Sequence, residues 1–404
     1  MRILIHTQYY PPEVGAPQVR LSELAKRFVE RGHEVFTLTA MPNYPIGRIY
    51  KGYGGFFRRE ERDGVTVVRS YVYPATGTKI RSRLANYFSF ALSSTVAGAF
   101  ALPKVDFVLT ESPPPFSSFT GFLLSKLKGA NWILNVADLW LEGAVRLGMI
   151  GEGHTVKAMR AVENFFYRKA WLVSGQSREI LESVVRSVPE VPTYHLSNGV
   201  DTRRFNPGLG SKDIRIALGD GQGCLAVYAG LHGIAQGLDQ VLDAAAMLQD
   251  MKDLCIVLIG DGPQKKTLME KARLLNLGNV QFLDPYPNHA IPAILASADI
   301  ALIPLKDQFA GAVPSKLYEA MGAGLPVVMA AGGEAGDILQ KAKAGMVIPP
   351  GDVESLASAL RLLARDRDKR AELGKNGRQA AVTLFDRKSI ADKFIDFLEK
   401  TARG

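Results

Sequence analysis

The order of segments along the chain constrains its fold most. Short apolar runs with the composition of buried strands alternate with longer segments that show helical periodicity. This alternation is typical of α/β proteins with parallel sheets, because the next parallel strand is reached only through a crossover, usually a helix. We expect strands at Ile3 to His6, Val35 to Thr39, Val65 to Ser70, Phe107 to Thr110, Ile133 to Val136, Leu172 to Ser174, Leu225 to Tyr228, Cys255 to Ile259, Val280 to Leu283, Ile300 to Pro304, Val327 to Met329 and Met346 to Ile348.

A segment rich in Pro, Gly, Asn and Asp, from Val191 to Gly210, separates the strands into two series. The 404 residues of the chain suffice for two domains of ordinary size, each with its own core. We therefore expect domains at residues 1–200 and 201–385, followed by an amphipathic segment at 386–404. Ligands of open parallel sheets bind beyond the carboxyl ends of the strands, so two such sheets facing each other would hold a ligand in the cleft between them.

Composition excludes several classes of function. A content of 47% hydrophobic and 22% charged residues is typical of a globular protein in water. The two cysteines, Cys224 and Cys255, lie in apolar runs and predict buried free thiols in a reducing cytoplasm, and Met1 to His6 begins a strand and not a signal peptide. The net charge of +9 suits ligands with phosphate groups or an anionic membrane. The sequence lacks both the interleaved aromatic and basic residues of nucleic-acid binding and the spacing of zinc ligands.

The segment from Pro314 to Met329 carries the most specific chemistry. It predicts a loop, a short helix and a buried strand. Glu319 lies on an otherwise apolar helix, where a carboxylate is costly to bury unless it accepts hydrogen bonds, and the paired hydroxyls of a ribose are suitable donors. Lys316 and the free N–H groups at the helix start form an anion site for phosphates. A nucleotide therefore fits both ends of this helix.

Several motifs together carry a resemblance to a known family. They are Tyr9 to Pro17, Glu30 to Val35, Met41 to Gly47, Ala137 to Trp140, Ser197 to Asp201 followed by Phe205, Gly260 to Pro263, and the segment from Pro314. In this order they resemble the retaining glycosyltransferases of family 4, over nearly the whole chain. Met41 to Gly47 and Ala137 to Trp140 are similar to one branch of it, whose members build bacterial surface polysaccharides with N-acetylated deoxy-sugars.

The resemblance implies two facing Rossmann-like domains, the GT-B architecture, with the active site in the interdomain cleft. Residues 1–200 would form the acceptor domain and residues 201–385 the nucleotide-sugar domain. The segment 386–404 would be a helix that packs back on the first domain.

The donor site departs from the family pattern. The family typically carries two Glu residues separated by seven others; Glu319 matches the second, and Gly311 occupies the first position. Its usual Arg and Lys for the diphosphate are replaced by Leu231 and Gln236. We expect Lys316 and a nest of backbone N–H groups to hold the diphosphate instead. The expected donor-binding residues are Gly15, Gly230, His232, Gly233, Gln236, Gly260, Gly311, Ala312, Pro314, Ser315, Lys316, Leu317 and Glu319.

The expected catalytic residues are Asp138, Glu142 and Lys316. Asp138 and Glu142 follow the strand that ends at Val136, although Asp138 fits a helix N-cap equally well. After the first strand, Gln8 to Arg20 indicates a long turn with Gly15 in its middle, and this glycine fits either a loop glycine with positive φ or a close approach to a donor phosphate. The resemblance implies transfer on one face of the sugar, with the leaving phosphate oxygen helping to deprotonate the acceptor. No metal is expected, since no Asp-x-Asp stands at a strand end.

The stretch from Tyr87 to Leu102 has no charged residue and follows Lys79, Arg81 and Arg83. It predicts either a buried helix of the first domain or an interfacial helix with its cations at lipid headgroups. In the second case we expect Tyr87, Phe88 and Phe90 to insert among the lipids. The sequence leaves both readings open.

The function that these observations favour is retaining transfer of a sugar, N-acetylated and carried by UDP, in bacterial surface polysaccharide synthesis such as that of O-antigen or capsule. The acceptor would be a glycan or a polyprenyl-diphosphate-linked glycan, and the enzyme would be cytoplasmic or peripheral on the cytoplasmic face of the inner membrane. The alternatives are a nucleotide-sugar epimerase or hydrolase on the same scaffold, and a non-catalytic nucleotide-sugar binding protein.

Overall fold

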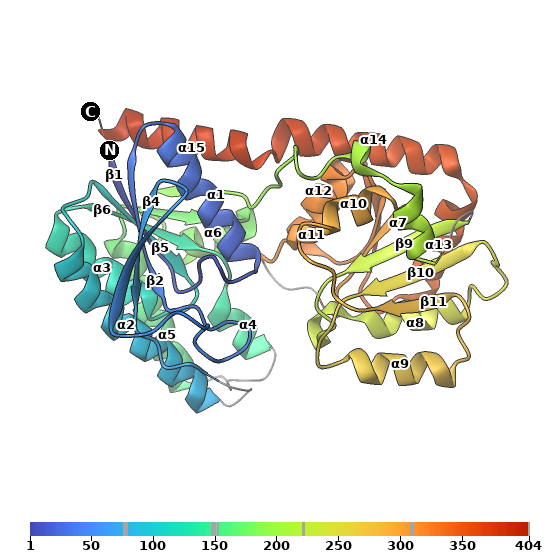
Figure 1. Cartoon of the computed structure of the whole chain (residues 1–404), viewed down its shortest axis with the longest axis horizontal. Helices are drawn as coiled ribbons and strands as arrows, with labels where there is room; N and C mark the ends of the chain where they lie inside the picture. Colours follow the sequence, from blue (N-terminus) through green and yellow to red (C-terminus); the bar gives the residue numbers. More distant parts are fainter. Residues whose placement is uncertain (76–79, 147–150, 152, 220–222, 308–310, 403–404) are drawn as a thin grey trace. The chain divides into compact units, whose positions relative to one another are not determined.

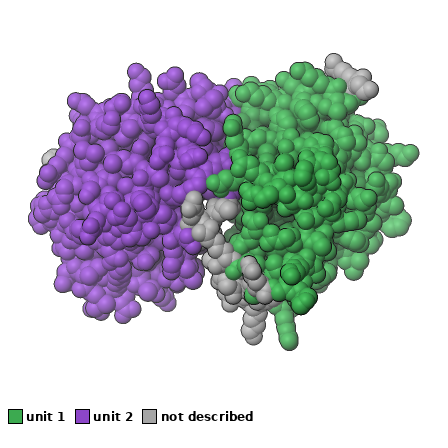
Figure 2. Space-filling view, turned by 180° about the vertical axis from the view of Figure 1, so that it is seen from behind, with its two compact units in different colours: residues 1–197, 388–404 green, residues 198–387 purple. Residues whose placement is uncertain are grey.

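The computed structural model describes residues 1–75, 80–146, 151, 153–219, 223–307 and 311–402. The chain forms two compact units, shown in different colours in Figure 2. Unit 1 comprises Met1–Ser197 and Lys388–Gly404, and unit 2 comprises Asn198–Arg387. Each unit is an α/β structure with its own sheet and core.

Unit 1 is built on an eight-stranded sheet in the order β3-β4-β2-β1-β5-β6-β7-β8 within its described residues. Every neighbouring pair is parallel except β3 and β4. The strands are β1 (Arg2–His6), β2 (Glu34–Ala40), β3 (Phe57–Arg62), β4 (Val65–Ser70), β5 (Phe107–Ser112), β6 (Asn131–Val136), β7 (Leu172–Gly175) and β8 (Thr193–His195). The helices are α1 (Ala16–Glu30), α2 (Ile80–Ala101), α3 (Ser117–Lys128), α4 (Trp140–Arg146), α5 (His154–Lys169), α6 (Arg178–Ser187) and α15 (Arg387–Ala402).

Helix α15 packs beside α1 in unit 1 (Figure 1). Its residues Phe394 and Leu398 join Leu21 and Phe28 of α1 in one buried cluster. Arg27 of α1 also bonds Asp392 of α15, with Nε 2.6 Å from Oδ1. The apolar face of α15 and this ion pair therefore fix the end of the chain on the first unit.

Unit 2 is built on a six-stranded parallel sheet in the order β11-β10-β9-β12-β13-β14 within its described residues. The strands are β9 (Cys224–Ala229), β10 (Leu254–Ile259), β11 (Val280–Leu283), β12 (Ile300–Pro304), β13 (Val327–Ala330) and β14 (Gly345–Ile348). The helices are α7 (Lys212–Ala217), α8 (Leu238–Ala246), α9 (Lys265–Leu274), α10 (Ile291–Ala296), α11 (Ser315–Gly322), α12 (Gly333–Lys341), α13 (Val353–Arg365) and α14 (Arg367–Leu384), with short 3-10 turns at η1 (Pro207–Leu209) and η2 (Ile234–Gln236).

The predicted α/β class with parallel sheets is confirmed, and every expected strand is present within two residues of its expected bounds. Strands β3 and β8 were not expected. The sequence of β3 is almost entirely charged after Phe57, because it lies at an exposed sheet edge, and β8 has only three residues. The interpretation of Gln8 to Arg20 as a long turn is wrong, because α1 begins at Ala16 with a proline in its first turn.

Both sheets reverse their strand order at one point. In unit 2 the chain leaves β9 toward β10 and β11 and returns to pair β12 on the other side of β9; in unit 1 the same reversal occurs between β1 and β5. Ligands of such sheets bind at the carboxyl ends of the strands beside the reversal. The site is therefore expected beyond β9 and β12 in unit 2, and beyond β1 and β5 in unit 1.

Candidate functional site

The loops after β9 and β10 in unit 2 cross in direct backbone contact. The N–H of Gly230 donates to the carbonyl of Ile259 at 2.9 Å, and the N–H of His232 donates to that of Asp261 at 2.8 Å. Gly260 has φ +143°, and a Cβ there would lie 1.8 Å from the carbonyl oxygen of Gly230. Only glycine fits this crossing, which places the backbone of 230–233 at the carboxyl end of β9.

Lys316 reaches this loop from the first turn of α11. Its Nζ lies 5.6 Å from the ring centroid of Tyr228, and it is 2.7 Å from the place that a Cβ on Gly230 would occupy. Burial lowers the pKa of the Lys316 ammonium, while the carboxylate of Glu319 acts in the opposite direction. The predicted proximity of Lys316 to the glycine loop is thus present, and Gly230 leaves room for the ammonium group.

Glu319 lies one turn further along α11, partly buried, and its neighbours Leu317, Tyr318 and Met321 are fully buried. Among the residues that the structure describes, none donates a hydrogen bond to its carboxylate at ordinary distance, although the carboxylate is near enough to Lys316 to affect that ammonium group. The loop before α11 contains Gly311, whose φ of 75° is left-handed, and α11 begins after Pro314 without a side-chain cap. Gly311, Ala312, Pro314 and Ser315 therefore lead directly into the turn that carries Lys316.

The His232 side chain is fully buried and packs near Tyr228 and Phe282. Neither ring nitrogen makes a hydrogen bond of ordinary geometry to a residue in the described part of the chain. Burial, together with the cation of Lys265, lowers the pKa of the imidazole. The imidazole is therefore neutral and internal, and its Nε2 lies at the loop crossing, 3.2 Å from the place that a Cβ on Gly260 would occupy.

The remaining polar residue expected at this edge is Gln236, in η2. A Cβ on Gly233 would lie 2.6 Å from its Oε1, so the residue folds back on its own loop. Sequence reasoning missed Gln240, whose Nε2 donates to the carbonyl of Leu305 at 3.0 Å while its Oε1 accepts the N–H of Gly351 at 3.0 Å. Gln240 thereby joins the loops after β12 and β14, and nothing in its local sequence marks it.

In unit 1, Gly15 caps α1 with an extended φ of 173°, so its position does not require a left-handed backbone. Asp138 precedes α4 by two residues and is exposed. Desolvation raises the pKa of the Asp138 carboxylate. The hydrogen bond that this carboxylate accepts from the backbone N–H of Leu139 lowers the same pKa in part. Exposure to water limits the size of such a shift.

Glu142 of α4 has partners inside unit 1. Its carboxylate accepts the hydroxyl of Ser183 at 3.2 Å and lies 3.8 Å from the guanidinium of Arg160. Glu163, which was not expected as a site residue, lies close enough for Glu142 and Arg160 to affect its ionisation. Burial raises the pKa of Glu163 to about 7.

A buried polar network lies at the carboxyl ends of β5, β6 and β7. Arg20 of α1 bonds Glu111 through Nη2, and both side chains are at most 5% exposed. Asn135 donates to Glu111 at 2.5 Å and accepts the hydroxyl of Ser174 at 2.7 Å. The three strand residues are register partners, so they line one face of the sheet. This network was not predicted, although charged or amide residues inside apolar strand runs are its sequence signal.

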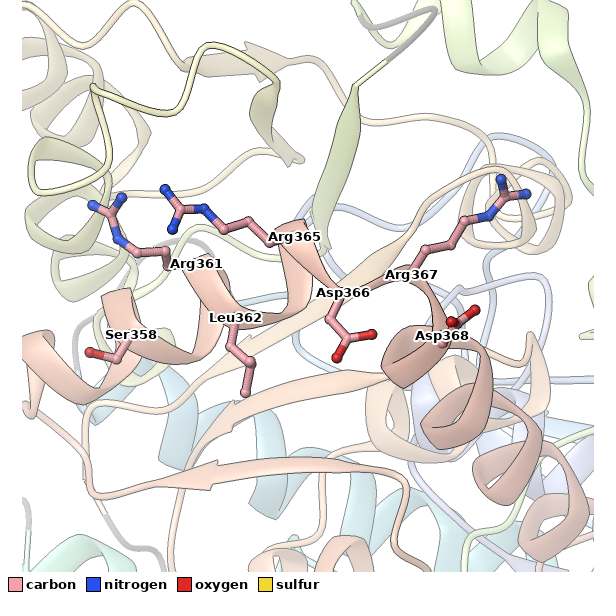
Figure 3. Close-up of a pocket in the computed structure, with 7 residues that line it drawn as sticks. All are labelled: Ser358, Arg361, Leu362, Arg365, Asp366, Arg367 and Asp368. Atoms are coloured by element: carbon pink, nitrogen blue, oxygen red, sulfur yellow. The ribbon is translucent and has the colours of Figure 1, made fainter.

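Two further observations bear on the site. Among the described residues, no three His, Cys, Asp or Glu side chains come together as metal ligands would. A surface pocket of about 710 Å³ is lined by α13 and the start of α14, including Arg361, Arg365 and Arg367 (Figure 3). Because α13 follows β14 and runs back along the sheet, its end lies at the amino-terminal edge, where Arg361 pairs with Asp250 before β10. This pocket is therefore separate from the carboxyl edge that holds Lys316.

Comparison with known solved structures supports the fold. The structure is similar to a sucrose-phosphate synthase from Thermosynechococcus elongatus, with a TM-score of 0.79, 18% identity and coverage of 100% of this chain and 99% of that one. It is also similar to Anabaena Alr3699/HepE, solved in complex with UDP-glucose, with a TM-score of 0.74, 19% identity and coverage of 99% and 100%.

Sequence comparisons give relatives over nearly the whole chain and others over about half of it. A putative colanic acid biosynthesis glycosyl transferase, WcaI of Escherichia coli, is 27% identical over 98% of this chain and 99% of its own. The N-acetyl-alpha-D-glucosaminyl L-malate synthase of Bacillus anthracis is 21% identical over 98% and 96%. A GDP-mannose-dependent mannosyltransferase of Mycobacterium tuberculosis is 28% identical over 52% and 56%.

Two family descriptions cover most of the chain, one on each unit. Residues 15–199 match the glycosyl transferase 4-like domain, and residues 218–380 match the glycosyl transferases of group 1. The resemblance carried by the sequence motifs is thus confirmed, and this chain belongs to the family-4 type of glycosyltransferases.

Proposed function

We propose that this enzyme is a retaining glycosyltransferase that moves an N-acetylated sugar from UDP to an acceptor in bacterial surface polysaccharide synthesis. The polysaccharide role is supported by the relative WcaI, named for colanic acid biosynthesis. The N-acetylated sugar is supported by the relative from Bacillus anthracis, and UDP by the neighbour solved with UDP-glucose.

The observation that carries the proposal is the position of Lys316 against the glycine loop of β9, one turn from Glu319. An ammonium group beside backbone N–H groups binds a diphosphate, and a carboxylate one helical turn away suits the hydroxyls of a ribose. In this arrangement Lys316 takes the place of the Arg and Lys that Leu231 and Gln236 do not supply, beside the N–H groups of 230–233 that the loop crossing does not use.

In the proposed reaction the bond between the anomeric carbon and the diphosphate oxygen breaks, and a bond to the acceptor oxygen forms on the same face of the sugar. The acceptor proton passes to the leaving phosphate oxygen, so no carboxylate nucleophile is needed. Lys316 stabilises the charge that develops on the diphosphate. Of the two carboxylates expected to be catalytic, we propose that exposed Asp138 meets the acceptor, because Glu142 accepts the hydroxyl of Ser183 inside unit 1.

Unit 1 would take the acceptor, a glycan that is free or linked to a polyprenyl diphosphate, and the enzyme would work at the cytoplasmic face of the inner membrane. The net charge of +9 suits both the anionic lipid surface and a diphosphate-bearing acceptor. Among the described residues, no helix has the length and hydropathy to cross a membrane.

The test is release of nucleoside diphosphate from a panel of UDP- and GDP-sugars, with and without acceptor glycans. Release of nucleoside diphosphate that requires an acceptor supports transfer. Release without an acceptor indicates a hydrolase, and conversion of the donor sugar into another sugar indicates an epimerase. NMR of the product reports whether the anomeric configuration is retained. A clear preference for GDP-mannose would overturn the UDP donor, as the mannosyltransferase relative makes a reasonable alternative.

A further inference from the structure

The sequence motifs Tyr9 to Pro17 and Met41 to Gly47 meet at the carboxyl edge of unit 1. The first motif follows β1 and the second follows β2, and these two strands are parallel neighbours. The carboxylate of Glu13 joins the motifs, because its Oε1 accepts the backbone N–H groups of Asn43 at 2.7 Å and Tyr44 at 2.8 Å. A buried side chain of the first motif therefore fixes the loop that carries Tyr44.

Two tyrosine rings lie together on these joined loops. The ring centroids of Tyr9 and Tyr44 are 5.5 Å apart, and the ring planes meet at 60°, which is an edge contact. Tyr9 is half-buried, whereas Tyr44 is 47% exposed. The hydroxyl of Tyr50 also donates to the carbonyl of Tyr44 at 2.6 Å. Tyr44 thus presents an aromatic ring to water from a backbone that is held by hydrogen bonds.

Helix α2 brings a third ring to this pair. Burial raises the pKa of the Tyr9 phenol, and the phenol of Tyr87 on α2 acts in the same direction, so the two side chains lie close together. Tyr87 is half-buried, and Phe90, one turn further, is fully buried with its ring stacked on His6. The expectation that Phe90 inserts among lipids is therefore wrong, and Lys79 lies outside the described residues. The first half of α2 contributes Tyr87 to the carboxyl edge of the sheet.

A buried amide oxygen at the same edge lacks a donor. Gln18, in the first turn of α1, is 2% exposed, and its Oε1 has no hydrogen-bond partner among the described residues. A Cβ on Gly15 would lie 2.5 Å from this oxygen, so the glycine leaves the space that the amide occupies. A buried acceptor without a donor is costly, and a hydroxyl group of a ligand would satisfy it.

The chemistry of this edge fits an uncharged sugar. A pyranose presents C–H groups on the flat faces of its ring and hydroxyl groups around its rim. The face of an aromatic ring carries partial negative charge and suits the C–H groups, and an amide oxygen accepts a hydroxyl. The buried charges of Arg20 and Glu111 are paired with each other, so they offer an anionic ligand no free cation. An aromatic ring with a few polar groups is typical of sites for small molecules.

We propose that the ring of Tyr44, held edge-on by Tyr9, stacks on the sugar of the acceptor that is glycosylated, and that Oε1 of Gln18 accepts one of its hydroxyls. The inference rests on the proposed function for the role of this sugar as an acceptor. It deepens that function by assigning the part of the acceptor that unit 1 recognises, an uncharged sugar ring. The loop from Met41 to Gly47 then determines which acceptor the enzyme uses.

The first experiment is saturation-transfer NMR of the full chain, with UDP present, on the methyl glycosides of glucose, galactose, mannose and N-acetylglucosamine. At least one glycoside should receive magnetisation, mainly at the C–H groups of one face. Tyr44→Ala should weaken its binding by ~10-fold or more, whereas Tyr44→Phe should bind like the wild type because it keeps the ring. The matched control is Phe100→Ala, which removes a ring that is 87% exposed at the far end of α2 and should leave binding unchanged.

The second experiment tests the amide with Gln18→Leu, which removes the unpartnered oxygen at similar volume. Glycoside binding should weaken by about 3–10-fold, the loss expected for one hydrogen bond. The melting temperature should stay the same or rise, because an apolar group replaces a buried acceptor that lacks a donor. Unchanged glycoside binding would remove Gln18 from the site. A lower melting temperature would show that the amide supports the fold, which also contradicts its assigned contact.

Two results would overturn the role of Tyr44. One is a wild type that binds none of the glycosides, or binds them no better than Tyr44→Ala does. The other is a Tyr44→Ala variant that binds UDP more weakly in calorimetry, because the ring would then hold the base of the donor.

Transfer assays separate this inference from the proposed function. A wild type that binds a glycoside through Tyr44 but whose UDP release does not depend on an acceptor supports the tyrosine site and overturns transfer. Acceptor-dependent release of UDP, with the same acceptor KM in Tyr44→Ala as in the wild type, does the reverse.

Discussion

The carboxyl edges of the two sheets have the same strand topology but different chemistry. In unit 2 the edge beside the order reversal is formed by glycine backbone and one partly buried cation, Lys316. In unit 1 the corresponding edge is filled by buried polar side chains that bond one another, including Arg20, Glu111 and Asn135. The carboxylate of Glu13 is also bonded inside unit 1, because it accepts hydrogen bonds from the backbone N–H groups of Asn43 at 2.7 Å and Tyr44 at 2.8 Å.

This difference separates what topology decides from what residues decide. The reversal of strand order determines where a ligand can meet each sheet, whereas the residues at the edge determine whether that place is open to an anion. Unit 2 places the cation of Lys316 at its edge beside the glycine loop, whereas unit 1 pairs its charged side chains with one another. Substitutions in the buried network of unit 1 should therefore lower stability, whereas substitutions at the edge of unit 2 should impair use of the donor.

The largest expected effect is on the stability of unit 1. Arg20→Met leaves the buried carboxylate of Glu111 without its cation, which should lower the free energy of unfolding by about 3–5 kcal/mol. Urea denaturation measures the loss. The matched control is Arg2→Met, which breaks the exposed pair with Glu34 and should cost less than about 1 kcal/mol. If the two variants lose equal stability, the buried network of unit 1 stabilises the fold no more than an exposed ion pair does.

At the edge of unit 2 the corresponding change should affect catalysis. Lys316→Met removes the cation beside the glycine loop and should lower kcat by about 10²–10³-fold, the range found when a group that stabilises developing charge is removed. The melting temperature should stay near that of the wild type, because a partly buried ammonium contributes little to stability. Lys341→Met, at a lysine whose side chain is 80% exposed, is the control and should keep wild-type kcat. A normal kcat in Lys316→Met would remove Lys316 from the site.

Glu319→Ala should weaken donor binding and leave folding intact. The lost pair of charge-assisted hydrogen bonds to the ribose corresponds to about 2–3 kcal/mol of binding free energy. Titration calorimetry with UDP alone measures this loss without any acceptor. Glu334→Ala, at a carboxylate in the first turn of neighbouring α12, serves as the comparison. Unchanged UDP affinity in Glu319→Ala would show that the ribose is held elsewhere.

A smaller effect should appear in the pH dependence. Burial lowers the pKa of Lys316, so the free enzyme loses this charge at a lower pH than an ordinary lysine with a pKa of about 10.4 would. Because the diphosphate needs the ammonium form, kcat/KM should fall as the pH rises through that lowered pKa. Lys316→Arg stays charged and should lack this alkaline decline. A decline that persists in Lys316→Arg belongs to another group.

The sequence predicted the fold well because parallel strands are buried on both faces and read as continuous apolar runs. It predicted the proximity of Lys316 and Glu319 because both lie on one short helix. Tyr228 and Gln240 were missed because their contacts join distant parts of the chain. The expectation that Phe90 inserts among lipids is wrong, because its side chain is fully buried and its ring stacks on His6. A helix that is apolar or small on every side gives no contrast between its faces, so the sequence did not show which side of α2 is buried.

The smallest expected effect is that of removing divalent metal. We propose that Lys316 and the backbone N–H groups of the glycine loop stabilise the departing diphosphate, so the rate should change less than about twofold in EDTA, well below the range for losing a charge-stabilising group. The measurement is the initial rate of UDP release with acceptor, after dialysis against EDTA and again after Mg²⁺ or Mn²⁺ is restored. Activity that is lost in EDTA and returns with either ion would contradict this. The edge of unit 2 would then be incomplete without an added cation, and the charge missing at Leu231 and Gln236 would be supplied by the metal.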